Sequence, residues 1–258
     1  KFKLNNLRIL KQFNGCCFAD LDLKQQGVIE DFQLLFYIIQ PPTPERVKYD
    51  IFDRVNRGGT PLNKQEMRNA LYRGRCTRML DKLCCSPEFL IATGRSINKE
   101  RMKDQYVVLR AMAFLMLHRG EFKDIPALQY RGDIDDFLAR FMVYVNDNAP
   151  EKLIVDYENL FIRCMQISYD LLGENGFRFS GNGIRRPINM PLFEALSYLF
   201  SFVPEKIDYT WVSRLILDIE SVKEEFDDSR YFSGNIDSTT SVSFRFDRMD
   251  KIINRIQL

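Results

Sequence analysis

Histidine is almost absent from this chain of 258 residues, in which His118 is the only one. An HNH-type nuclease uses histidines as general base and metal ligands, so the sequence excludes that class of enzyme. His118 lies near the end of a predicted helix over residues 99–119, where we expect a surface residue or a helix cap. A Walker A phosphate loop and a glycine-rich dinucleotide fingerprint are also missing, which excludes the nucleotide-binding proteins that those motifs define.

Cysteines are few and have no metal-binding pattern. The six lie at positions 16, 17, 76, 84, 85 and 164, and no pair has the two-residue spacing of a zinc knuckle or redox motif. Adjacent cysteines rarely bridge each other, so we expect reduced thiols and a cytoplasmic location. We also expect no metal site, because four clustered carboxylates are typical of the solvated end of a helix: Glu224, Glu225, Asp227 and Asp228.

Long apolar runs are missing too. The longest, around residues 34–39 and 111–117, are far shorter than the roughly 18 residues that cross a bilayer. No secretory leader is visible, so we expect neither export nor a membrane partner. The chain begins KFKLNNLRIL without a methionine, and we expect the natural protein to continue upstream.

Charge is unevenly distributed, although the net charge is only +2 from 37 basic and 35 acidic residues. Residues 52–78 hold seven basic and two acidic side chains, whereas residues 205–228 hold eight acidic and three basic ones. Affinity for phosphate depends on clustered rather than total charge. The first segment is therefore the better candidate for contact with a polyanion.

Two segments near the start of the chain have strand-like composition. Residues 2–10 alternate loosely between apolar and polar side chains, and residues 31–40 form an aromatic and β-branched run that ends at two prolines. A buried helix over residues 30–40 is the alternative.

Helical periodicity dominates the rest of the sequence. A first helix begins at Pro44 and ends at Gly58 and Gly59, and Asn63 and Glu66 have the spacing of a capping box for the next one. Further helices are predicted over residues 76–92, 99–119, 131–147, 151–172, 188–203, 207–228 and 241–257.

These patterns predict an α+β fold. We expect a small α/β portion over residues 1–60, followed by a larger, predominantly helical domain over residues 61–258 with a further subdivision near residues 120–150. A hydrophobic content of 45% is ample to form such a core.

The connector between the first two helices has the chemistry of an anion site. Gly58 and Gly59 leave their backbone amides unobstructed, and the helix that opens at Asn63 presents unpaired amides and the positive end of its dipole. Guanidinium groups nearby suit phosphate, at Arg54, Arg57 and Arg68. In the alternative interpretation the glycines end one helix, Asn63 caps the next and the arginines are solvated.

The same connector resembles a known family. The matching residues are Phe52, Arg54, Asn56, Gly58, Gly59, Pro61, Leu62, Gln65, Glu66, Arg68 and Asn69. They are similar to the downstream signature of the N-terminal domain of GmrSD-type, modification-dependent type IV restriction enzymes, which has a ParB-like, sulfiredoxin-related fold. Weaker similarity covers residues 1–40, 107–115, 135–138 and 185–196.

The resemblance implies a role in phage defence, with NTP and Mg²⁺ as ligands and hydrolysis coupled to DNA restriction. The nucleotide or DNA phosphate would then contact Arg54, Asn56, Arg57, Gly58 and Gly59, supported by Arg68 and Asn69. The family's Asp-Gly-Gln-Gln-Arg motif is missing, and the KQQG sequence at residues 24–27 is not equivalent to it. The catalytic residues are therefore unknown, and an upstream segment or a partner chain would supply them.

DNA is the expected partner of further basic residues, and these candidates are Arg73, Arg75, Arg78, Arg185 and Arg186. The last two could instead flank the start of a helix. Four phenylalanines beside arginines could stack on bases, although their spacing is typical of a core: Phe177, Phe179, Phe244 and Phe246. A different class of function is a non-catalytic scaffold that recruits a nuclease or DNA.

Overall fold

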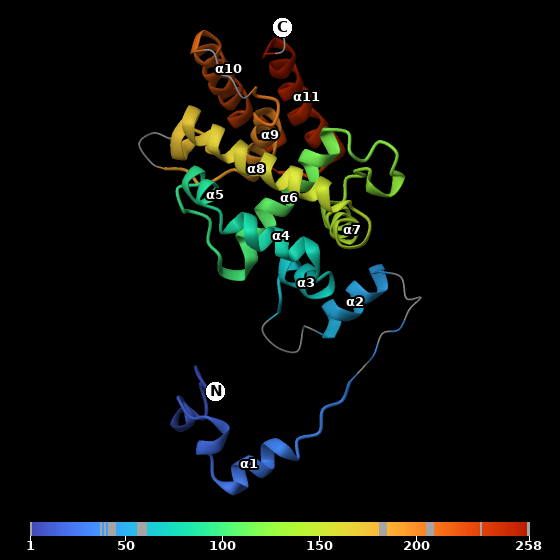
Figure 1. The fold of residues 1–258 in the computed structure, drawn as a ribbon, viewed down its shortest axis with the longest axis vertical. Helices are drawn as coiled ribbons and strands as arrows, with labels where there is room; N and C mark the ends of the chain where they lie inside the picture. The colour runs from blue at the N-terminus through green and yellow to red at the C-terminus, as the bar shows by residue number, and fades with distance from the viewer. Residues whose placement is uncertain are drawn as a thin grey trace. The chain divides into compact units, whose positions relative to one another are not determined.

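The computed structural model describes residues 2–36, 38, 40, 45–55, 61–180, 185–204, 209–232 and 234–256. The chain divides into two compact units, Lys1–Lys48 and Tyr49–Leu258, and helix α2 (Glu45–Val55) spans the boundary between them. Figure 1 shows that the second unit is built from packed helices.

The first unit has no β-strand within its described residues, so the predicted α/β portion is wrong and the fold is predominantly helical. It holds two short 3-10 turns, Lys11–Phe13 and Phe18–Asp20, followed by helix α1 (Leu23–Glu30). Asp22 caps α1: its side chain accepts from the Gln25 amide at 2.8 Å, and the Gln25 side chain accepts from the Asp22 amide at 3.2 Å. This capping box is a local signal that sets the start of α1.

Residues 31–36 show why the strand prediction failed. They follow α1 without regular structure, so the alternative helix over residues 30–40 is not formed there either. Phe32, Leu34, Leu35 and Phe36 are each at least 67% exposed. A strand is stabilised by hydrogen bonds to a neighbouring strand and by burial of its apolar side chains. The described residues of this unit provide neither.

The second unit largely confirms the predicted helices. The 76–92 segment is interrupted at Cys85 and Ser86, where the Ser86 side chain caps a new helix that has Pro87 in its first turn. No helix in the described ranges is long and apolar enough to cross a membrane. The helix bounds are α3 (Lys64–Leu71), α4 (Arg75–Cys84), α5 (Pro87–Ala92), α6 (Lys103–His118), α7 (Ile134–Asp147), α8 (Glu151–Leu172), α9 (Met190–Phe200), α10 (Tyr209–Asp227) and α11 (Thr239–Ile256).

Helices α6 and α9 form the centre of this unit. Residues 107–116 and 191–200 are buried without interruption. Helix α6 packs against α4, α7 and α9, while α9 also packs against α8 and α11 (Figure 1). The four phenylalanines beside arginines belong to the same core, which confirms their packing role: Phe177, Phe179 and Phe246 are buried, and the half-buried Phe244 packs against the core.

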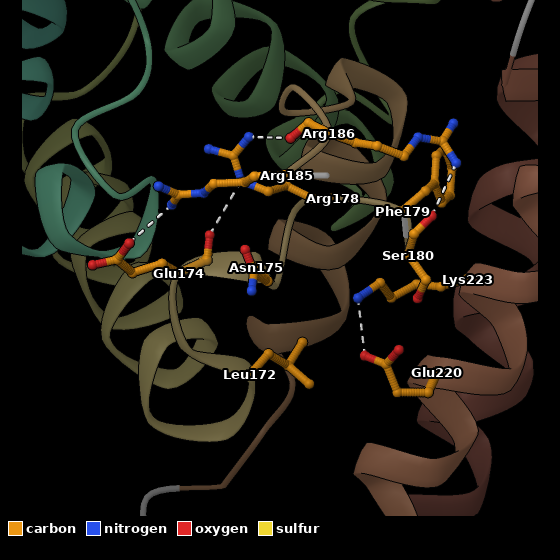
Figure 2. Close-up of a pocket in the computed structure, with 10 residues that line it drawn as sticks. All are labelled: Leu172, Glu174, Asn175, Arg178, Phe179, Ser180, Arg185, Arg186, Glu220 and Lys223. Atoms are coloured by element: carbon orange, nitrogen blue, oxygen red, sulfur yellow. Dashed lines mark hydrogen bonds and ion pairs between the residues drawn. The ribbon is translucent and has the colours of Figure 1, made fainter. Parts of the chain in front are cut away.

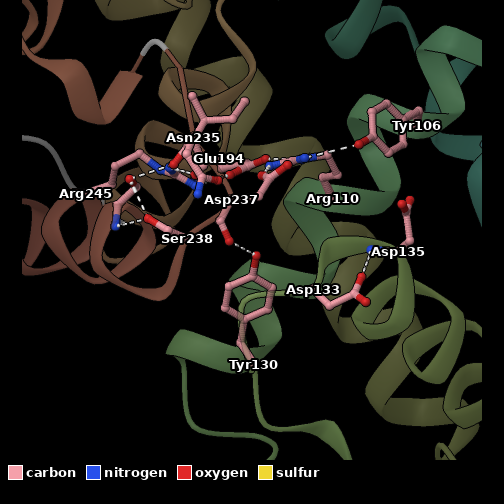
Figure 3. A network of polar contacts seen from close by, with 12 residues as sticks. Tyr106, Arg110, Tyr130, Asp133, Asp135, Glu194, Asn235, Asp237, Ser238 and Arg245 are labelled. Atoms are coloured by element: carbon pink, nitrogen blue, oxygen red, sulfur yellow. Dashed lines mark hydrogen bonds and ion pairs between the residues drawn. The ribbon is translucent and has the colours of Figure 1, made fainter.

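A buried network of charges joins the central helices (Figure 3). Glu194 on α9 accepts from Arg110 on α6 through one oxygen and from Arg245 on α11 through the other, at 3.0 Å for Arg245. Arg110 also donates to Asp237 at 2.7 Å. Burial opposes the charge of Arg110, but Glu194 and Asp237 raise its pKa above the ordinary value. The network thus connects α6, α9 and α11 with the segment that precedes α11.

His118 ends α6 as predicted, but it is not a surface residue. Its ring is stacked on Phe246 with centroids 3.6 Å apart, and its Nε2 atom is buried without a hydrogen-bond partner among the described residues. Burial, assisted by the positive charge of Arg245, lowers the pKa of His118 to about 3. The imidazole is therefore neutral at pH 7, and its position follows from α11 packing over the end of α6.

Candidate anion-binding pocket

The predicted cradle between α2 and α3 lies largely outside the described residues. Asn56, Arg57, Gly58 and Gly59 belong to the part of the chain that the structure does not describe. Arg54 lies in the last turn of α2 and is exposed. The role of these five residues in ligand binding stays a prediction.

The start of α3 is closed by the protein's own groups. The Asn63 side chain accepts from the backbone amides of Gln65 at 2.8 Å and Glu66 at 2.9 Å, and a Glu66 oxygen accepts from the Asn63 amide at 2.6 Å. The predicted capping box is therefore confirmed. Arg101 donates to Glu66 at 2.9 Å and, through this hydrogen bond above all, lowers the pKa of that carboxyl. These amides already have acceptors and do not need an external anion.

Arg68 and Asn69 point into the packing of α3 rather than into open solvent. Arg68 has 1% of its side chain exposed and donates to Asp135 at 2.8 Å and to Gln65 at 3.0 Å. Asn69 accepts from Gln65 at 2.8 Å and donates to Gln105. Both residues hold α3 to its neighbouring helices, and a supporting role toward a ligand stays a prediction.

The basic residues around α4 divide into two groups. Arg75 pairs with Glu151 at 3.1 Å and donates to the Ala149 carbonyl at 3.0 Å, which connects α4 to the start of α8. Arg73 and Arg78 are exposed and have no ion pair within the described residues. Their contact with DNA stays a prediction.

Arg185 and Arg186 line a pocket of about 640 Å³. We call it the loop pocket and define it by its lining residues: Leu172, Glu174, Asn175, Arg178, Phe179, Ser180, Arg185, Arg186, Glu220 and Lys223. Figure 2 shows the three arginines together on one side, with Lys223 and Glu220 facing them from α10. The segment that follows α8 and helix α10 therefore form its opposite walls.

Arg178 fixes the local path of this segment. The chain leaves α8 at Gly173, whose φ of 62° is readily adopted only by glycine. Arg178 is 4% exposed and donates to the carbonyls of Glu174 at 3.3 Å and Thr93 at 3.2 Å, and also to Arg186 O and Ser96 Oγ. All four acceptors are uncharged. Burial, followed by repulsion from Arg185, lowers the pKa of Arg178.

The other three basic residues of the loop pocket pair with carboxylates. Arg185 donates to Glu174 at 2.9 Å, Arg186 pairs with Asp227, and Lys223 donates to Glu220 at 2.9 Å. A Cβ atom on Gly94 would overlap the Arg185 guanidinium, so the missing side chain at Gly94 leaves room for the Arg185–Glu174 pair.

The loop pocket has a net positive charge. Its lining contains four basic side chains and two carboxylates, Glu174 and Glu220, which gives a formal charge of +2 from four minus two. Asp227 pairs with Arg186 but does not line the pocket. The sequence pointed to Arg185 and Arg186 but not to Arg178 and Lys223. Arg178 lies in the glycine-rich stretch RFSGNGIRRP, which was the only signal for it. The sequence contained no signal for Lys223.

The described residues contain no group of three or more histidine, cysteine or acidic side chains that could hold a metal ion. The predicted solvated carboxylates at residues 224, 225, 227 and 228 are exposed, as expected. The arrangement is suited to binding an anion through guanidinium and ammonium donors.

Comparisons with known proteins add no relative. A scan against protein-family models, a search of curated proteins and a search of solved structures each found no match.

Proposed function

We propose that this chain binds phosphate, as nucleotide or as DNA backbone, within a bacterial restriction or anti-phage defence system. The observation that carries the phosphate part is the loop pocket, where four basic side chains meet two carboxylates. The resemblance of residues 52–69 to GmrSD-type enzymes supplies the defence context. Arg54 and Asn56 remain part of the proposal as contacts to the same class of ligand.

The physical reason is the match between donor and ligand. A guanidinium group presents a planar fork of donors that suits phosphate oxygens, and clustered cations attract an anion more strongly than scattered ones. The guanidinium group of Arg178 has a fixed position because it donates hydrogen bonds to four acceptors. Binding a ligand to such a fixed cation costs less conformational entropy, because the side chain is already ordered.

Hydrolysis of NTP enters this proposal only with residues from an upstream segment or a partner chain. The KQQG sequence at residues 24–27 lies in α1, where the Gln25 side chain accepts from the amide of the capping residue Asp22 at 3.2 Å and Gln26 donates to the Leu21 carbonyl at 2.8 Å. The loop pocket does not fit a resident Mg²⁺ site, because its two carboxylates are already paired. Glu174 pairs with Arg185, and Glu220 pairs with Lys223.

A second candidate function is a non-catalytic scaffold or DNA-recruiting module for a partner nuclease. The observation that favours it is the apolar surface of the first unit. Large exposed apolar surfaces mark sites of protein association. Within residues 2–38 the exposed large apolar side chains are Phe2, Ile9, Leu10, Phe18, Leu23, Val28, Ile29, Phe32, Leu34, Leu35, Phe36 and Ile38.

Binding measurements with ATP and with a 20-base-pair DNA duplex test the proposed function. Arg54→Ala and Asn56→Ala should weaken binding of ATP or of DNA, and Arg185→Gln should weaken binding of ATP. DNA affinity should fall steeply as salt rises because phosphate contacts release counterions. Arg248→Gln is the matched control: it removes one ion-paired arginine, partnered by Glu225, outside the loop pocket.

Unchanged binding in all three variants would contradict the phosphate proposal. Salt-independent association with DNA, or capture of a partner nuclease without any nucleotide affinity, would instead favour the scaffold.

A further inference from the structure

We infer that the loop pocket accepts the phosphomonoester of a small molecule of mononucleotide size, and not the internal phosphodiesters of a nucleic acid. The inference rests on the proposed function and names the ligand class of the same pocket. It depends on the size of the pocket, its charge and the arrangement of its donors.

The dimensions of the loop pocket suit a small molecule. Its volume of about 640 Å³ lies within the range of roughly 300–1,000 Å³ that is usual for small-ligand sites. Its walls come from two sides, the segment after α8 and helix α10 (Figure 2). Specific DNA interfaces are broad and bury at least roughly 600 Å² of protein surface, and this local hollow is not such a surface.

The charge of the loop pocket distinguishes a monoester from a diester. A phosphomonoester carries about −1.5 to −2 at pH 7, whereas each phosphodiester of a nucleic acid carries one negative charge. The lining contributes +2. Arg186 is already neutralised by Asp227, so a ligand meets the charges of Arg178, Arg185 and Lys223 once Glu174 and Glu220 turn toward solvent. A monoester compensates more of that charge than a diester does.

The donors around the pocket can be released toward a ligand to different extents. The Arg185–Glu174 pair is exposed, with 44% and 53% of the two side chains accessible, and exposed ion pairs contribute little stability. Lys223 has 6% of its side chain exposed and its partner Glu220 has 41% exposed, so Glu220 can move into solvent while Lys223 stays in the pocket. Arg178 is buried and is held by four uncharged acceptors, so it adds a fixed positive charge to the lining.

The rest of the lining suits the organic part of such a ligand. Asn175 is exposed, and its side-chain amide has no hydrogen bond within the described residues; Figure 2 shows it between the arginines and Leu172. The Asn175 amide can hydrogen-bond a sugar hydroxyl. Leu172 adds apolar surface on the same wall.

The test compares ligands that differ in one property at a time. Calorimetric titration of the full chain would use adenosine 5′-monophosphate, cyclic 3′,5′-adenosine monophosphate, adenosine, inorganic phosphate and a 20-nucleotide strand with hydroxyl ends. The cyclic compound keeps the base and sugar but has a diester with a single charge. The variants are Arg185→Gln and Lys223→Gln, with Arg248→Gln as control and thermal melting as the check on folding.

We expect adenosine 5′-monophosphate to bind at least about tenfold more tightly than its cyclic diester, and adenosine not to bind measurably. Each pocket substitution should weaken binding of the monophosphate about tenfold, because a hydrogen bond to a charged group is lost. The control substitution should leave this affinity unchanged. Should a variant fail to fold, the ranking of the ligands on the unmodified chain still decides.

Two results would overturn the inference. Equal affinity for the monophosphate and its cyclic diester would show that the pocket does not distinguish the charge of the two ligands. Binding of the DNA strand alone, weakened by Arg185→Gln and Lys223→Gln, would assign the pocket to DNA. In both cases the phosphate-binding function would survive. If no phosphate compound bound in a manner dependent on these residues, the inference and the pocket's role in the proposed function would fail together.

Discussion

Replacement of Glu194 by glutamine should strongly destabilise the second unit. Glu194 and Arg245 have no exposed side-chain surface, and Arg110 has 1% exposed. The substitution keeps the size of the side chain but removes the negative charge that both guanidinium groups face. Arg110 would retain Asp237 as a charged partner, whereas Arg245 would keep its hydrogen bond to the Ile236 carbonyl but would have no ion pair within the described residues.

The expected magnitude follows from the burial of the pair. Removing one partner of a buried ion pair costs about 3–5 kcal/mol, because the remaining charge has no compensation away from water. That is a large fraction of the roughly 5–15 kcal/mol by which folded proteins are stable. For a chain of this size the melting temperature should fall by roughly 10 °C.

Urea denaturation followed by far-ultraviolet circular dichroism measures this effect. The matched control is Glu225→Gln, which breaks a partly exposed pair with Arg248 and should change the free energy of unfolding by no more than about 1 kcal/mol. If both variants lowered the free energy of unfolding by the same small amount, the argument that burial makes Glu194 critical would be refuted.

Two further predictions follow from buried titratable groups. The unfolded chain protonates His118 near pH 6.5, but the folded chain only near pH 3, so this contribution to stability is complete above pH 6.5 and is lost as pH falls. Between pH 6.5 and pH 5 the loss should be about 2 kcal/mol, and His118→Leu should abolish it; an unchanged pH slope in that variant would contradict the assignment. Burial also raises the pKa of Cys164 to about 12 and that of Cys76 further, so iodoacetamide should label the exposed Cys85 far faster than either of them, as counted by mass spectrometry. Equal labelling rates would show that the core opens readily.

The sequence predicted most helices of the second unit because their signals are local. Helix α8 runs from Glu151 to Leu172 as expected, since Pro150 restricts the backbone before its first residue and Gly173 adopts the positive φ that ends it. The Asn63 and Glu66 capping box also formed as predicted, because it depends on residues three apart. Apolar composition misled the prediction for residues 31–36, because a strand requires a partner that composition does not reveal.

The candidate site could be predicted only in part for the same reason. Arg185 and Arg186 were visible as a basic pair in a glycine-rich loop. Arg68 was expected to bind phosphate, but its place in the fold gives it Asp135, a residue of another helix, as partner. Lys223 gave no signal, since its neighbours in the sequence are mostly acidic and only the packing of α10 brings it to the loop pocket.

The sequence by itself determined the start of α3 and both ends of α8, because capping, proline and glycine act through the backbone within a few residues. Tertiary structure alone decided which charges became buried partners and which line a pocket. The energy of a charged side chain depends on its distance from other charges and from water, and packing of distant segments sets both.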